Sequence, residues 1–157
     1  MKMILAMTAM AISLAASGAT TGEAMAQTET LTPATEDWNP FSRSAVKVYM
    51  ADVNSFIQTG NVIGARVAKV PLGAQPGDYG YATDQIEVRC STKQSRLVFS
   101  IEYGPDGVQT DRFDEPEEWA TYAPETRDAY LAQLVCDGDR TTTSWPSIKA
   151  FIDAGRP

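Results

Sequence analysis

Alternation of apolar and polar residues dominates the middle of the chain and predicts β-strands. Residues 46–50, VKVYM, alternate in this way, and so do residues 62–70, VIGARVAKV. The clearest strands are TDQIEVRC at 83–90 and RLVFSIEY at 96–103, each with one apolar and one mixed face. Half-exposed strands of this kind indicate an antiparallel sheet, because parallel strands are usually apolar on both faces.

Short polar segments separate these strands and predict turns. In ADVNS, residues 51–55, the side chains of Asp52 and Asn54 can bond their own backbone, so we expect the chain to turn there. A second turn is expected at TGN, residues 59–61. These turns make the early strands a series of hairpins.

Two later connections differ in length. Residues 71–80, PLGAQPGDYG, are rich in glycine and proline and predict a long loop. PDG at 105–107 is a strong turn signal that leads to a weak strand at 108–113. The weak pattern of this strand is typical of a sheet edge.

The period of the pattern changes near the C-terminus, where helices are expected. PETRDAYLAQLVC, residues 124–136, begins with a proline and a glutamate suited to the first helical turn, and Asp137-Gly138 ends it. WPSIKAFIDAG, residues 145–155, predicts a second short helix that Ser144 can cap. Strands first and helices last predict an α+β fold, with one or two C-terminal helices packed on one face of a meandering antiparallel sheet.

The N-terminus has the pattern of a secretory signal peptide. Lys2 precedes an apolar run at residues 3–16, which is shorter than the roughly 20 residues that span a bilayer. The A-x-A motif at 24–26 places the expected cleavage between Ala26 and Gln27. Earlier cleavage or an uncleaved anchor are the alternatives. No cysteine stands near the junction, so a lipobox is absent.

The composition of the chain that remains after cleavage limits its domain organisation and its classes of partner. Residues 27–37 carry no aromatic residue and predict a disordered leader, followed by a single domain at 38–157. A net charge of −7 without a basic stripe argues against nucleic acid. No second apolar run reaches membrane length, so we expect a periplasmic or secreted protein with no membrane span after signal cleavage.

Only two cysteines occur, Cys90 and Cys136. In an exported chain of this size they favour a disulfide over a reactive thiol or a metal ligand. At about 100° per residue, Cys136 would point away from the apolar stripe of the preceding helix. We therefore expect that helix to loosen before Cys136.

The chain contains no histidine, which restricts its chemistry. Ser-His-Asp and Cys-His catalysis are excluded, and so is any zinc site that uses histidine. Four acids at 114–118 allow an acid/base pair or a calcium site to be drawn, but a solvated acidic turn is favoured: Asp114, Glu115, Glu117 and Glu118. DGD at 137–139 is favoured as a helix stop. We expect no catalytic residue, no metal site and no cofactor, and hence no enzyme.

Aromatic residues give the one suggestion of binding. Tyr79 and Tyr81 flank Gly80 in the 71–80 loop, and exposed tyrosines beside a glycine suit a contact surface. Packing over the sheet edge is the alternative. The tryptophans are expected to anchor the core or its rim: Trp38, Trp119 and Trp145.

The order and spacing of these segments resemble the surface-adhesin protein E family of Gram-negative bacteria. The resemblance covers about residues 38–138 and rests on an ordered set: Trp38, VKVYM followed by ADVNSF, VIGARVAKV, IEVRC, RLVFSIEYGPDGVQ, Trp119 and YLAQLVC. It implies a small antiparallel sheet with a C-terminal helix held by a Cys90–Cys136 disulfide. The named member of the family is an exported adhesin that dimerises and binds host vitronectin and laminin.

Two features depart from the family pattern. Members commonly carry an acidic residue where this chain has Arg89, and the named adhesin is lipid-anchored. We expect an exported non-enzymatic binding domain, for which a host matrix protein is one candidate partner and homodimerisation is an option. The alternatives are a periplasmic structural or assembly component that acts through protein contacts, and a carboxylate-dependent envelope hydrolase.

Overall fold

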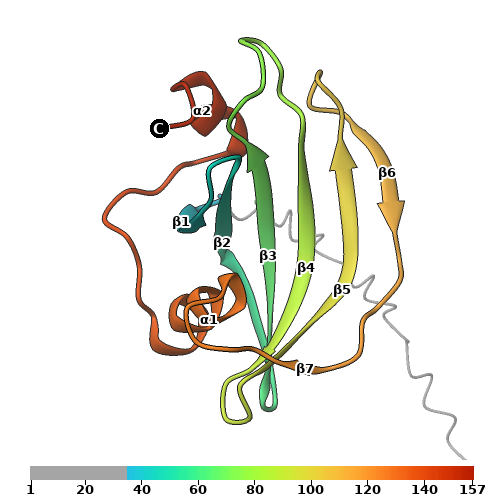
Figure 1. Ribbon diagram of the computed structural model, residues 1–157, viewed down its shortest axis with the longest axis vertical. Helices are drawn as coiled ribbons and strands as arrows, with labels where there is room; N and C mark the ends of the chain where they lie inside the picture. Colours follow the sequence, from blue (N-terminus) through green and yellow to red (C-terminus); the bar gives the residue numbers. More distant parts are fainter. Residues whose placement is uncertain (1–34) are drawn as a thin grey trace, which may run out of the picture. The chain divides into compact units, whose positions relative to one another are not determined.

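The computed structural model describes residues 35–157, which form a meandering antiparallel sheet (Figure 1). The expected signal peptide and most of the expected leader lie outside the described residues. The strands are β1 (Trp38–Arg43), β2 (Lys47–Thr59), β3 (Val62–Pro71), β4 (Tyr81–Arg89), β5 (Gln94–Tyr103), β6 (Gln109–Phe113) and β7 (Ala120–Thr121). Strands β1 to β6 pair in chain order, and β7 pairs with β5. The predicted α+β meander is confirmed.

Strand β2 is longer than its sequence pattern indicated. The turn expected at residues 51–55 was wrong, because the strand continues and its pairing with β3 shifts register between Asp52 and Ile57. The Asn54 N–H donates to the Asp52 carboxylate, and the Ser55 hydroxyl donates to the Asp52 carbonyl. With β1 and β3 on either side, these local bonds produce a bulge in the strand and no reversal.

The first C-terminal helix changes its winding before it ends. α1 (Arg127–Ala132) starts at Thr126, whose side chain accepts a hydrogen bond from the Ala129 N–H. It continues as a π-helical turn, η1 (Gln133–Asp137), so the helix does loosen before Cys136 as predicted. A π turn is wider than an α turn and changes the direction in which its side chains point.

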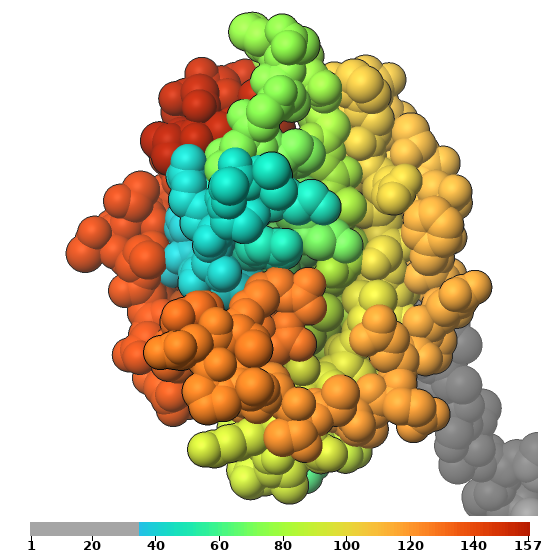
Figure 2. All heavy atoms as spheres, in the orientation of Figure 1, coloured from blue at the N-terminus to red at the C-terminus, as the bar shows by residue number. Residues whose placement is uncertain are grey.

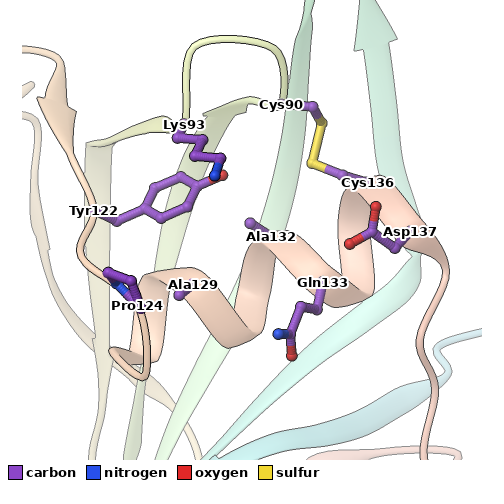
Figure 3. Close-up of a pocket in the computed structure, with 9 residues that line it drawn as sticks. All are labelled: Cys90, Lys93, Tyr122, Pro124, Ala129, Ala132, Gln133, Cys136 and Asp137. Atoms are coloured by element: carbon purple, nitrogen blue, oxygen red, sulfur yellow. A yellow bond between two sulfur atoms is a disulfide. The ribbon is translucent and has the colours of Figure 1, made fainter.

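A disulfide joins Cys90, directly after β4, to Cys136 in η1, with a Cα–Cα distance of 5.8 Å (Figure 3). The predicted bridge between a strand and a helix is therefore confirmed. Its sequence separation of 46 residues corresponds to roughly 4 kcal/mol in the chain-entropy model. The bridge holds η1 against the lower end of the sheet.

The second helix begins later than expected. α2 (Ile148–Asp153) is capped by Ser147, whose hydroxyl accepts the N–H of the third helical residue at 3.0 Å. The expectation of a Ser144 cap was wrong. Trp145 cannot belong to the helix, because its backbone exchanges two hydrogen bonds with Trp38, at 2.9 and 3.0 Å.

The two helices pack on opposite faces of the sheet. Met50 packs with α2 and the next residue, Ala51, packs with α1, and successive strand residues point to opposite faces. Figure 2 shows the α1 segment, in orange, on the face toward the viewer. We expected both helices on one face. They divide because the connection between them passes the β1 edge, where the Asn39 side chain bonds Thr141.

Each helix closes its own half of the core. The α2 side contains Trp38, Val48, Met50, Ala68, Val70, Ile148, Phe151 and Ile152. The α1 side contains Ala51, Val53, Val67, Ile86, Val88, Leu131, Ala132 and Leu134. Burying one large apolar side chain stabilises a fold by about 1.5–3 kcal/mol, so both faces contribute to stability. Within residues 35–157, no helix is long and apolar enough to cross a bilayer.

Candidate functional site

The loop between β3 and β4, residues 72–80, lies against α2 and encloses two cavities with it. We call this region the loop–α2 cleft. The first cavity, of about 290 Å³, is lined by Glu36, Tyr79, Tyr81, Asp106, Lys149 and neighbouring residues of α2. The second, of about 340 Å³, is lined by Leu72, Pro76, Tyr79, Ile152, Arg156 and adjacent residues. Tyr79 and Ile152 belong to both cavities.

Tyr79 is held through both its backbone and its side chain. Its backbone N–H donates to the Pro105 carbonyl at 2.8 Å, and its hydroxyl donates to Asp153 of α2 at 2.8 Å. Lys149 lies 4.6 Å from the ring centre and pairs with the same aspartate at 2.6 Å. Hydrogen bonds from Lys149 and then from Tyr79 lower the pKa of Asp153. The ring is thus fixed in place by contacts within the chain.

Tyr81 is positioned by stacking. It opens β4 opposite Tyr103 of β5, and the two rings lie 4.3 Å apart with an angle of 7° between their planes. Burial, reinforced by Tyr103, raises the pKa of Tyr81 to about 12. The phenol therefore stays neutral at physiological pH. Both predicted tyrosines pack against the α2-side core and also line the first cavity, and a binding role for them stays a prediction.

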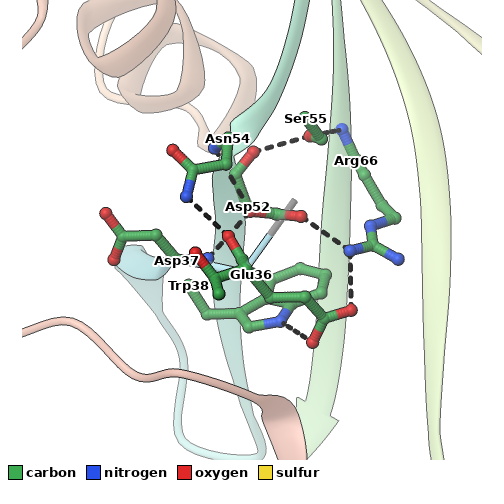
Figure 4. Close-up of polar contacts among 8 residues, drawn as sticks. Glu36, Asp37, Trp38, Asp52, Asn54, Ser55 and Arg66 are labelled. Carbon is green, nitrogen blue, oxygen red and sulfur yellow. Dashed lines mark hydrogen bonds and ion pairs between the residues drawn. The ribbon is translucent and has the colours of Figure 1, made fainter. Parts of the chain in front are cut away.

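An ion-pair network supports the wall of the first cavity (Figure 4). Nη2 of Arg66 lies 2.7 Å from Glu36 and 2.6 Å from the buried Asp52. The Trp38 indole N–H donates to the other Glu36 oxygen at 2.8 Å. Burial alone would lower the pKa of Arg66, but the bonds and charges of Asp52 and Glu36 outweigh it and raise that pKa. The network fixes one carboxylate at the cavity.

Sequence reasoning missed most of these polar residues. It assigned Glu36 to the leader, whereas Glu36 and Asp37 contact the sheet. The two cations in the VIGARVAKV strand, Arg66 and Lys69, were the available signal, because a cation on a covered strand face needs a carboxylate. Nothing in the sequence pointed to Lys149 as a cavity residue, since its pattern is that of an ordinary exposed residue on a helix.

Electrostatics give the first cavity an acidic character. Arg66 is shared between Glu36 and Asp52, so that network keeps one negative charge, and Asp106 adds another carboxylate to the lining. The charge of the one lining lysine, Lys149, is matched by Asp153. Aromatic faces and nearby carboxylates together favour a cationic or hydrogen-bond-donating group. The cavity is therefore suited to recognition, and it presents no paired nucleophile and base.

A third cavity, of about 370 Å³, lies beside the disulfide (Figure 3). Its walls include Cys90, Cys136, Lys93 and Tyr122. Both sulfur atoms are committed to the bridge, so the cavity offers no thiol nucleophile. The space follows from the way η1 is tied to the end of β4.

The acidic segment at 114–118 is exposed and runs between β6 and β7. Asp114 pairs with Arg112 at 2.6 Å, which lowers the pKa of Asp114. Across residues 35–157, no three or more histidine, cysteine or acidic side chains are grouped to hold a metal ion. Gly138 adopts a φ of 75° and ends η1, so the helix-stop interpretation of 137–139 is confirmed.

Arg89, where the resemblance led us to expect an acidic residue, stacks on a tryptophan. Its guanidinium lies 3.7 Å from the centre of the Trp119 ring, and that of Arg96 lies 4.7 Å from the same ring. Trp119 is thus a rim residue of the sheet. Trp145 packs edge-on against Phe151 in the α2-side core.

One comparison with known proteins gives a match. The model of the family described as surface-adhesin protein E matches residues 38–137. This span includes the whole sheet, α1, η1 and both cysteines, and it ends before α2. No curated protein and no solved structure shows a significant match to the chain. The matched span exceeds half of the sequence, and the chain belongs to the surface-adhesin protein E family.

Proposed function

We propose that the protein is an exported, non-enzymatic binding domain of the bacterial envelope that recognises a protein partner through the loop–α2 cleft. Membership of an adhesin family supports a surface or exported role. The disulfide fits an oxidising compartment. The observation that carries the proposal is the convergence of Tyr79 and Tyr81 on one cavity. Aromatic side chains are enriched at protein interfaces, where they supply large contact areas.

The cleft is organised in advance of binding. Tyr79 is fixed by Pro105 and Asp153, and Tyr81 is stacked on Tyr103, so neither ring loses much freedom when a partner binds. The acidic first cavity and the net charge of −7 favour a partner segment that presents lysine or arginine. A host matrix protein is one such candidate, with vitronectin and laminin as the family-guided choices.

Binding of the exported protein to immobilised vitronectin and laminin, measured by biolayer interferometry, tests the proposal. We expect micromolar or tighter affinity for at least one of them, and about a tenfold loss in a Tyr79→Ala, Tyr81→Ala double variant. Tyr130→Ala is the matched control, because Tyr130 is 38% exposed on α1 at the opposite face. Millimolar affinity for both proteins would remove the host-matrix version. An equal loss in the control would move the site away from the cleft.

An assembly role in the periplasm is the second candidate, and one observation favours it. All five residues of β6 are exposed at the edge of the sheet. Such an edge can accept a strand from another chain or from a second copy. A photo-crosslinker at Gln109 should then capture a stoichiometric partner or a homodimer in cells, whereas one at Lys93 should not. A lone monomer at both positions would count against this role.

A further inference from the structure

Arg156 is a buried cation that lacks a carboxylate partner within the described part of the chain. The residue is 8% exposed. Two buried acids, Asp52 and Asp84, each have an ion-pair partner, Arg66 and Lys69 respectively, at 2.6 Å. No ion pair forms to Arg156 among residues 35–157. A buried charge is costly unless an opposite charge or several hydrogen bonds compensate for it.

The hydrogen bonds of Arg156 leave most of its donors free. Nη2 donates to the backbone carbonyl of Asp78 in the loop, and Nε is buried without a partner. A guanidinium carries five N–H donors, and a neutral carbonyl satisfies only one of them. The residue also adopts a φ of 57°, where non-glycine residues are uncommon. The chain thus holds a cation in the interior in an unfavourable backbone conformation.

The second cavity of the cleft lies against this side chain. Its apolar walls include Leu72, Pro76 and Ile152. Its one lining carboxylate, Asp153, is already engaged by Lys149 and the Tyr79 hydroxyl. The carboxylate of Asp78, on the loop, accepts the N–H of Gly80. Neither carboxylate forms an ion pair with Arg156. The guanidinium therefore lies unpaired beside a wall that suits an aliphatic group.

We propose that the second cavity binds a carboxylate attached to an aliphatic chain. The guanidinium of Arg156 pairs with the carboxylate, and Leu72 and Ile152 contact the aliphatic part. Arginine suits this role, because its planar fork matches the two oxygens of a carboxylate. The inference deepens the proposed function, and it rests on that function only for the choice of the loop–α2 cleft as the binding region. A peptide C-terminus and a fatty acid share this chemistry.

Titration of the ¹⁵N-labelled exported protein with N-acetyl-leucine and with hexanoate tests the site by NMR. We expect saturable shifts of the Gly77, Tyr79 and Arg156 signals, and no such shifts with hexanol. Arg156→Gln should weaken binding at least tenfold. Arg112→Gln is the matched control and should bind as the original does, because Arg112 is an exposed arginine on β6. Preference for N-acetyl-leucine supports a peptide terminus, and preference for hexanoate supports a fatty acid.

Several outcomes would overturn the inference. Equal shifts with hexanol, absence of shifts with both carboxylates, or unchanged binding in Arg156→Gln each exclude the carboxylate site. If Arg156→Gln does not fold, the Nε–H signal of Arg156 in the original protein decides, because a bound carboxylate must shift it. If the carboxylate titration fails but the Tyr79→Ala, Tyr81→Ala variant still loses partner binding, the proposed function stands without the carboxylate site. If the carboxylates shift these signals but no protein partner is found, the carboxylate site is supported and the proposed function is not.

Discussion

Two tyrosines separated by one glycine are held in different ways. Tyr79 relies on hydrogen bonds to Pro105 and Asp153, and Tyr81 relies on its stack with Tyr103. The sequence placed both in one loop and suggested contact residues. It did not reveal the stack, because Tyr103 lies on another strand and meets Tyr81 only through the register of β4 and β5.

The environment of Tyr81 predicts a late alkaline titration. Burial raises its pKa from 10.0 to about 12, so the folded state prefers the neutral phenol. The stability that this preference contributes is complete below pH 10 and is lost as the pH rises from 10 toward about 12. Ultraviolet absorbance of tyrosinate should show a late step toward pH 12 that Tyr81→Phe removes, and burial also raises the pKa of Tyr122. A single step near pH 10 for all six tyrosines would contradict the stacked, buried geometry.

At the scale of elements, most wrong predictions of secondary structure come from local sequence signals that tertiary contacts override. Asp52 and Asn54 favour a turn in isolation, yet pairing on both sides converts the segment into a bulge of β2. The loosening of the helix before Cys136 was predictable from Asp137-Gly138, but its π form was not. The π turn contains Cys136, whose bridge to Cys90 is a contact between segments that are distant in the sequence.

The caps of α2 give a prediction with an internal control. Ser147→Ala removes the hydroxyl that accepts a backbone N–H at 3.0 Å, and should destabilise the protein by about 1 kcal/mol. Ser144→Ala should change stability by less than about 0.5 kcal/mol, because Ser144 is exposed and precedes the bridged Trp145. Urea unfolding of the two variants measures both values. Equal destabilisation in the two variants would contradict Ser147 as the cap of α2.

For the whole molecule, the order of strands follows from short connections, whereas the placement of helices does not. Hairpin-length turns allowed the meander to be predicted. The face on which α2 packs depends on how residues 139–145 pass the β1 edge, and no local pattern encodes that route. The cleft was only partly predictable for the same reason. Glu36, Lys149 and Arg156 reach it from segments distant from the 72–80 loop.

Because α1 and α2 pack on opposite faces of the sheet, loss of the disulfide should affect the two helices unequally. A Cys90→Ser, Cys136→Ser variant should lose roughly 4 kcal/mol of unfolding free energy, measured in urea. Because only η1 is tethered, amide hydrogen exchange should accelerate in α1 and η1 before it does in α2 and β1. Reduction of the unmodified protein should reproduce this order. Simultaneous loss of protection in both helices would show that the two faces unfold as one.

The backbone bridge between Trp38 and Trp145 joins the span that the family model matches to a segment outside it. The family match begins at Trp38 and stops at residue 137, yet Trp38, 1% exposed, is covered by the segment that follows. A chain cut after Asp137 would keep every position that the family model matches and still uncover its own first strand. The segment that the family model describes is therefore shorter than the segment that closes the core, and one wall of the cleft lies outside the match.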